Sequence, residues 1–190
     1  MIRPVLVSAV VLGLAACGGP AVGPTTPAMA PGGQQVYRIQ PGTEDAVQLR
    51  FLDGMNALRQ AAGAPPVAFN ASLNAAAATH ARDMSVQNRP WHFGSDGSSP
   101  LDRVRRVGYG GRLLGENISE TFETELETLA AWMETPETRT IITDPQATDL
   151  GFSWFQEASG KIWWTMVTGN RSAAAINNAA TAAVAPPAGR

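Results

Sequence analysis

The spacing of apolar residues changes once along this 190-residue chain, and this change constrains the fold more than any other feature. Up to residue 133, apolar residues recur at intervals of three and four, which predicts helices in four stretches: 46–62, 73–84, 99–108 and 124–133. Between residues 150 and 166 they alternate with other residues on both sides of Ala158-Ser159-Gly160, which predicts a β-hairpin in which Trp163 and Trp164 point to opposite faces. Helices that flank a small, mostly antiparallel sheet form a three-layer α-β-α sandwich, so we expect an α+β fold.

Polar residues mark where these helices begin and end. Asn70 or Ser72 can cap the second helix. Two segments have the pattern of a capping box, Ser99-Pro100-Leu101-Asp102 and Thr124-x-x-Glu127. In a capping box, a hydroxyl and a carboxylate each accept a hydrogen bond from a backbone amide. Pro136 is expected to end the fourth helix.

The N-terminus resembles a bacterial lipoprotein signal peptide over residues 1–16. Arg3 supplies a positive charge, and residues 5–14 form an apolar run too short to span a bilayer. The run ends in Leu14-Ala15-Ala16-Cys17, which is similar to a lipobox in which the Cys17 thiol would carry a diacylglyceryl group. The alternative is an ordinary signal peptide with an incidental cysteine. Gly18, in place of an aspartate, implies the periplasmic face of an outer membrane by resemblance to sorted lipoproteins.

Composition divides the rest of the chain into three parts. Residues 17–43 hold the lipidated cysteine and a Gly- and Pro-rich stretch with almost no charge, which we expect to act as a flexible tether. Residues 44–170 are expected to form one domain, and the Ala-rich residues 171–190 a disordered tail. Cys17 is the only cysteine, so no intramolecular disulfide can form and the domain has no cysteine nucleophile. The formal net charge of −2 argues against a nucleic-acid partner.

Two ionisable residues between Trp91 and Asn117 are candidates for a functional site. His92 precedes a glycine-rich turn, and Glu116 lies between Gly115 and Asn117. We expect each in an irregular segment beside a regular one, an arrangement typical of polar clefts. An imidazole and a carboxylate can transfer a proton together, but a buried glutamate bonded to His92 and to loop amides could equally hold the loops in place. Trp91, beside His92, is expected to be an exposed aromatic.

Six motifs follow one another along the domain. They are Met55-Asn56-Ala57-Leu58-Arg59 with Ala64-Pro65-Pro66-Val67, Thr79-His80-Ala81-Arg82-Asp83-Met84, Gly94-Ser95-Asp96-Gly97-Ser98-Ser99-Pro100 with Asp102-Arg103, Gly115-Glu116-Asn117-Ile118, Trp132-Met133-Glu134-Thr135-Pro136 and Trp163-Trp164-Thr165-Met166-Val167. Together they resemble the bacterial, SCP-like form of the CAP superfamily, named after cysteine-rich secretory proteins, antigen 5 and pathogenesis-related 1. The resemblance covers the whole domain and implies the same α-β-α layering and the binding of ligands that include sterols and lipids.

The resemblance also implies a polar cleft lined by two histidines and two acidic residues. His92 and Glu116 match the first two of these positions, and Glu134 or Glu137 would supply the second acidic residue. The second histidine is missing, because Thr138 stands where bacterial relatives usually have it.

The remaining residues limit the chemistry. His80 is expected to be a hydrogen-bonded helix histidine, and the sequence contains neither a His-Glu-x-x-His nor a Gly-x-Ser-x-Gly motif, so we expect no metal and no other cofactor. Three functions stay open: a protein that binds a small or lipidic ligand, a cell-envelope hydrolase that uses His92 and Glu116 as an acid–base pair, and a non-catalytic structural or interaction module. The expected partners are the membrane, through the lipid anchor, and the ligand, and we expect a monomer.

Overall fold

The structure is a computed structural model that describes residues 36–172. The predicted signal peptide, Cys17, the tether up to residue 35 and the tail from residue 173 lie outside the described residues. Between residues 36 and 172, no helix is both long and apolar enough to cross a membrane. The elements are, in chain order, α1 Glu44–Ala61, β1 Ala68–Phe69, α2 Ala71–Gln87, α3 Pro100–Arg106, β2 Arg112–Thr121, α4 Glu125–Glu134, α5 Pro136–Thr143, β3 Asp149–Gln156 and β4 Ile162–Asn170.

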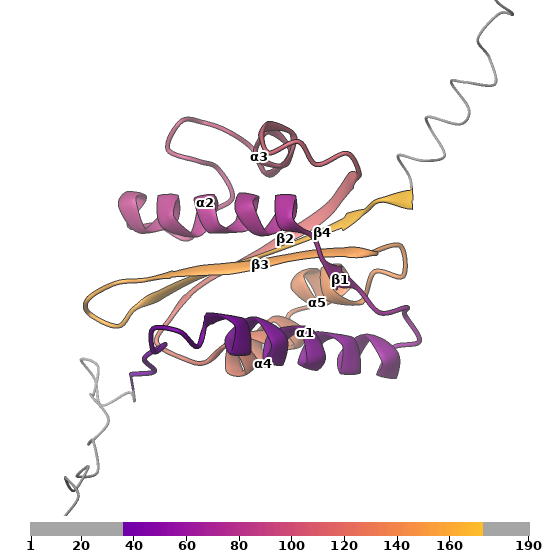
Figure 1. Cartoon of the computed structure of the whole chain (residues 1–190), viewed down its shortest axis with the longest axis horizontal. Coiled ribbons are helices and arrows are strands. Elements are labelled where there is room, and N and C mark those ends of the chain that lie inside the picture. Colours follow the sequence, from indigo (N-terminus) through magenta and orange to yellow (C-terminus); the bar gives the residue numbers. More distant parts are fainter. Residues whose placement is uncertain (1–35, 173–190) are drawn as a thin grey trace, which may run out of the picture.

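The four strands form one sheet in the order β1-β3-β4-β2. The short strand β1 pairs with β3 in parallel, whereas β3 and β2 both pair with β4 in antiparallel register. Helices α2 and α3 cover one face of the sheet, and α1, α4 and α5 cover the other (Figure 1). The predicted α+β class and the three-layer α-β-α arrangement are therefore confirmed.

Local sequence accounts for the starts of three helices. The side-chain oxygen of Asn70 accepts hydrogen bonds from the amides of Ser72 (3.0 Å) and Leu73 (3.2 Å), so Asn70 rather than Ser72 caps α2. Both predicted capping boxes are present: Ser99 pairs with Asp102 before α3, and Thr124 pairs with Glu127 before α4.

Two elements differ from the sequence-based expectation. Helix α4 ends at Glu134, as predicted, but Pro136 then begins a further helix, α5, because its fixed φ and missing amide suit the first helical position. Residues 112–121, expected to be irregular around Glu116, form the edge strand β2. The alternation of a strand is hidden here because Glu116 and Asn117 are both buried, and polar residues are buried only where distant partners satisfy them.

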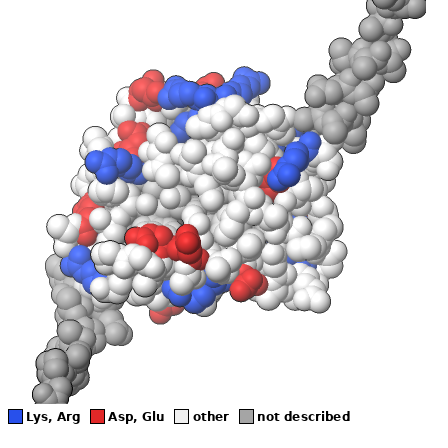
Figure 2. Space-filling model, viewed as in Figure 1, with Lys and Arg blue, Asp and Glu red and all other residues white. Residues whose placement is uncertain are grey.

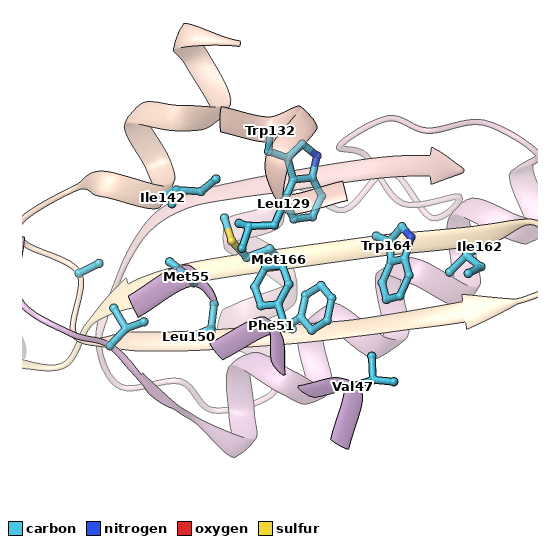
Figure 3. Packing of buried hydrophobic residues seen from close by; sticks show 13 residues of the cluster. Val47, Phe51, Met55, Leu129, Trp132, Ile142, Leu150, Ile162, Trp164 and Met166 are labelled. Carbon is cyan, nitrogen blue, oxygen red and sulfur yellow. The ribbon is translucent and has the colours of Figure 1, made fainter. Parts of the chain in front are cut away.

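The larger core lies between the sheet and helices α1, α4 and α5. Phe51 stacks on Phe152 with ring centroids 3.6 Å apart, and Phe152 stacks on Trp164 at 5.4 Å. Figure 3 shows Phe51 of α1 and Trp132 of α4 converging on this face of the sheet. Trp163 packs on the opposite face, against α2, and both tryptophans are fully buried. The prediction that the two tryptophans point to opposite faces is confirmed.

Helix α2 approaches the sheet closely because its inner face is built from small side chains. Ala76, Ala77 and Ala81 are buried there. At Gly151 of β3, a Cβ atom would lie 2.3 Å from the backbone carbon and oxygen of Leu73. The helix can occupy this position only because residue 151 has no side chain.

The first described residues, Val36–Pro41, lie on the domain, and we call them the N-terminal strap. The amide of Tyr37 donates a hydrogen bond to the carbonyl of Phe122 (2.9 Å), and the side-chain amide of Gln156 donates to the carbonyl of Tyr37 (2.8 Å). Val36 is buried against Gly160, where a Cβ atom would lie 2.3 Å from Val36 Cγ1. Residues 36–41 of the stretch expected to form a tether therefore contact the domain.

Replacing Gly151 by alanine tests the packing of α2. The added methyl group must displace the helix backbone, and overpacking of this kind costs about 1–3 kcal/mol, so we expect a clear fall in the urea midpoint of Gly151→Ala. Gly110→Ala is the control, because a Cβ atom at residue 110 has no neighbour within 4 Å. Equal midpoints for the two variants would contradict this account of α2.

Candidate functional site

Glu116 lies in the middle of β2 and turns its carboxylate toward α2 and α3. The residue is only 6% exposed. Nη2 of Arg103, from α3, donates to both carboxylate oxygens at 2.9 and 2.8 Å. Arg103 is itself 4% exposed, so the two residues form an ion pair that is shielded from water on both sides.

Arg103 also fixes the loop between α2 and α3, residues 88–99, which we call the His92 loop. Its Nη1 atom donates to the carbonyls of His92 (3.0 Å) and Ser98 (3.1 Å). One guanidinium therefore joins α3, the edge strand and both ends of the glycine-rich turn that follows His92.

His92 reaches Glu116 from this loop. Its Nδ1 atom lies 2.9 Å from Oε1 of Glu116, while 49% of the side chain stays exposed. Because a carboxylate only accepts hydrogen bonds, Nδ1 carries the proton that is shared with Glu116. In the neutral ring the other nitrogen, Nε2, is then an acceptor, and within residues 36–172 it has no hydrogen-bond partner. The structure thus brings His92 and Glu116 into direct contact, although Glu116 comes from a strand and not from an irregular segment.

His80 joins the same cluster from α2 and is fully buried. Its Nε2 atom lies 3.0 Å from the carbonyl of Trp91 and 3.7 Å from Oε1 of Glu116. A carbonyl cannot donate, so Nε2 carries the proton and Nδ1, which has no partner among the described residues, is bare. Burial lowers the pKa of His80, and this effect outweighs the opposing attraction of Glu116. His80 is therefore a neutral, hydrogen-bonded helix histidine, as expected, but only one of its two ring nitrogens has a partner among the described residues.

Glu116 is ionised in this environment. Burial alone would raise the pKa of its carboxyl group, but the hydrogen bond from His92, together with the charges of His80 and Arg103 and the Arg103 hydrogen bonds, brings the pKa below its usual value. Since His80 is neutral near pH 7, Arg103 and His92 are the partners that stabilise the carboxylate there.

Trp91 is half-buried rather than fully exposed. Its ring nitrogen donates to Gln87 at 2.7 Å, and the guanidinium of Arg89 lies 3.9 Å over the ring. The exposed aromatic of the loop is Phe93, which is 47% exposed with its ring centroid 5.5 Å from that of Trp91. Trp91 and Phe93 thus flank His92 in the chain, and their rings lie beside each other.

Glu134 and Glu137 are not brought to this cluster. Glu134 ends α4 and Glu137 lies in the first turn of α5, so both belong to the layer on the other face of the sheet, and both are exposed. Thr138, at the position of the missing histidine, donates its hydroxyl hydrogen bond to the carbonyl of Trp132. Arg103 and His80, which complete the cluster around Glu116, both lie within the six motifs of the domain.

The hollows on the described surface include four of about 170–460 Å³, and neither His92 nor Glu116 lines any of these four. The smallest, about 170 Å³, lies behind Arg103 and is lined by Asp83 and Arg106 among others. Between residues 36 and 172, no group of three or more His, Cys, Asp or Glu side chains is arranged to hold a metal ion.

Known proteins share this sequence pattern and this fold. Residues 52–168 match the family model described as CAP, the cysteine-rich secretory protein family. The uncharacterized protein YkwD of Bacillus subtilis (strain 168) is 29% identical over 123 residues, which cover 65% of this chain and 47% of that protein. The chain thus spans about half the length of this relative.

Solved structures with the same fold come from several bacteria. An extracellular protein containing an SCP domain, from Bacillus anthracis, superposes with a TM-score of 0.63 at 22% identity, over 71% of this chain and 45% of that one. An outer surface protein of Borrelia burgdorferi gives a TM-score of 0.62 at 14% identity, over 72% of this chain and 99% of that one. At these identities the likeness concerns the fold.

Glu116→Gln tests whether the Arg103 ion pair supports the domain. The substitution leaves Arg103 buried without a charged partner, and breaking a buried pair in this way costs about 3–5 kcal/mol. Urea unfolding measures the loss. Asp96→Asn removes one member of the exposed pair Asp96–Arg106 and is the control, with an expected loss of about 1 kcal/mol or less. Similar losses for both variants would contradict a supporting role for the buried pair.

The buried neutral ring of His80 predicts a pH dependence of stability. Its pKa is lower in the folded chain than the value of about 6.5 in an unfolded chain, so below that pH the unfolded state binds more protons and stability falls. The depressed pKa of Glu116 acts at lower pH, since its contribution is lost only as pH falls below about 4.3. We therefore expect the urea midpoint to fall between pH 7 and pH 5, and to fall less in His80→Gln. Identical pH profiles for both proteins would contradict this assignment.

Proposed function

This chain belongs to the CAP family of cysteine-rich secretory proteins, and from that premise we propose that it is a lipid-anchored protein of the bacterial cell envelope that binds a small or lipidic ligand at His92 and Glu116. The observation that supports this proposal is the state of His92. One ring nitrogen is fixed by Glu116, and the other has no partner among residues 36–172 and lies on a half-exposed ring.

A ligand that fits this arrangement has a hydroxyl or amide hydrogen to donate to Nε2 of His92. The ring cannot turn away without breaking its 2.9 Å contact with Glu116, so the acceptor is held in one direction. Phe93, the next residue in the same loop, is 47% exposed and provides apolar surface there, with its ring 5.5 Å from that of Trp91. A polar head bonded to His92 and an apolar body against Phe93 describe a small amphipathic molecule such as a lipid.

The proposed location rests on the N-terminus. The lipobox-like Leu14-Ala15-Ala16-Cys17 supports lipidation of Cys17, and Gly18 supports the periplasmic face of an outer membrane. The fold relatives from Bacillus anthracis and Borrelia burgdorferi are described as extracellular and outer surface proteins, which agrees with export. The mass of the mature protein tests the anchor, since acylated Cys17 would become its first residue.

A hydrolase that uses His92 and Glu116 for acid–base work is less well supported. A carboxylate makes its histidine partner a stronger base only to the extent that its negative charge is free to act. Here Arg103 donates to both oxygens of Glu116, so much of that charge is already compensated. These contacts support a structural role for Glu116 and leave binding to His92.

His92→Ala tests the proposed ligand site by native mass spectrometry of the exported protein. We expect an additional bound mass on the wild type and its loss from the variant, because one hydrogen bond and the ring contact account for a loss in affinity of about tenfold or more. Thr79→Ala, an exposed residue of α2, is the control and should keep the ligand. A bound mass that persists in His92→Ala, or that is absent from the wild type, would contradict the proposed site.

A further inference from the structure

One end of the domain gathers the segments that lie nearest to the N-terminal anchor. Arg38 of the N-terminal strap donates to the carbonyls of Glu157 (3.4 Å) and Ala158 (2.9 Å) in the turn between β3 and β4. In the same turn, Lys161 donates to the side chain of Asn88, at the C-terminal end of α2 (2.8 Å). The strap, the hairpin turn and the start of the His92 loop are therefore continuous, and Figure 1 shows them at the left end of the molecule. We call this surface the strap end.

The strap end carries positive charges that have no carboxylate partner within residues 36–172. Arg38 is bonded to backbone carbonyls. The guanidinium of Arg82 lies 5.0 Å over the ring of Phe155, and that of Arg89 lies 3.9 Å over the ring of Trp91. All three are exposed. Of the acidic neighbours, Glu120 and Glu157 are paired with Lys161, at 3.1 and 3.7 Å. Glu44, Glu123 and Glu127 instead line the hollows beside Arg38, so Arg82 and Arg89 are the cations with the fewest carboxylates around them.

Apolar side chains protrude among these cations. Val86 is 76% exposed, one turn of α2 beyond Arg82. Phe93 is 47% exposed, and its carbonyl accepts a hydrogen bond from Gln87 in the last turn of the same helix. Exposed apolar side chains with flanking arginines are the composition that binds the boundary between lipid headgroups and acyl chains.

The other basic surface is a poorer candidate. Figure 2 shows Lys and Arg along the top of the molecule, over α3, with acidic atoms beside them. There Arg106 is paired with Asp96 at 2.9 Å, and Asp102 occupies the first turn of the helix. That surface is also farther along the chain from the strap.

We propose that the strap end lies against anionic phospholipid headgroups of the membrane that holds the anchor. The proposal rests on the lipid anchor proposed above, because the predicted tether 18–35 would span about 25 Å and so keep this end of the domain near the bilayer. Arginines at positions 38, 82 and 89 bind phosphate groups, while Val86 and Phe93 enter the interface. Strand β4 ends at the opposite end of the sheet (Figure 1).

A single label on the full-length lipidated protein tests this orientation. An acylated Cys17 has no free thiol, so an introduced cysteine is the only reactive one. Val86→Cys places an environment-sensitive fluorophore at the strap end, and Ala61→Cys, exposed at the far end of α1, is the control. In vesicles of phosphatidylethanolamine and phosphatidylglycerol with brominated chains, we expect a blue shift and quenching at position 86 and neither at position 61.

Charge variants identify the lipid chemistry. Each cation near an anionic surface contributes about a fivefold increase in docking, so replacing phosphatidylglycerol by a zwitterionic lipid should abolish the quenching at position 86. Arg82→Glu/Arg89→Glu should abolish it as well. Arg105→Glu/Arg139→Glu changes the net charge equally at exposed positions elsewhere and should leave it intact.

The failure of docking and the failure of the anchor give different results. Protein that floats with vesicles but shows the same water-exposed signal at positions 86 and 61 would overturn the docking proposal and leave the anchor standing. A mature mass without acyl groups would contradict the anchor alone. In that case, docking is measured with the same two labels on Cys17→Ser protein mixed with the anionic vesicles. If the vesicles left the emission of the label at position 86 unchanged, the docking proposal would be overturned.

Discussion

The ion pair between Glu116 and Arg103 is the contact on which the arrangement of α3, β2 and the His92 loop depends. Placing either charge alone inside the domain would cost several kcal/mol, so each residue requires the other in a fixed position. Arg103 completes its hydrogen bonds with the carbonyls of His92 and Ser98. The loop conformation is thus set by the need to satisfy a buried guanidinium, and the position of His92 follows from it.

This dependence separates the roles of the two residues that the sequence suggests as a pair. Glu116 is enclosed, with hydrogen bonds to both of its oxygens, whereas the His92 ring is half-exposed and its Nε2 atom has no partner among the described residues. A buried residue with all its hydrogen bonds made, such as Glu116, stabilises the structure around it. A half-exposed residue such as His92 can contact another molecule. The orientation of His92 is set by the carboxylate behind it, so a rigid structural centre and an open binding surface are parts of one arrangement.

Features that depend on neighbouring residues in the sequence could be predicted, and features that depend on distant contacts could not. The hairpin and the capping boxes are local patterns, as is the placement of Trp163 and Trp164 on opposite, buried faces of the sheet. Strand β2 escaped prediction because it buries two consecutive polar residues, and their burial makes sense only once Arg103 and α5 are placed beside them. The half-satisfied ring of His80 depends likewise on where the loop carbonyl of Trp91 falls.

The strap end and the proposed ligand site share the His92 loop, so the two proposals together suggest how a ligand could reach His92. Trp91 and Phe93 flank His92 in the chain, so a membrane surface that receives Phe93 also comes within reach of the free nitrogen of His92. A ligand with a polar head and an apolar body then has a route from the lipid layer that does not cross water, which lowers the cost of moving its apolar part. On the two proposals together, the bilayer would cover the apolar part of the ligand while its polar head meets the half-exposed ring of His92.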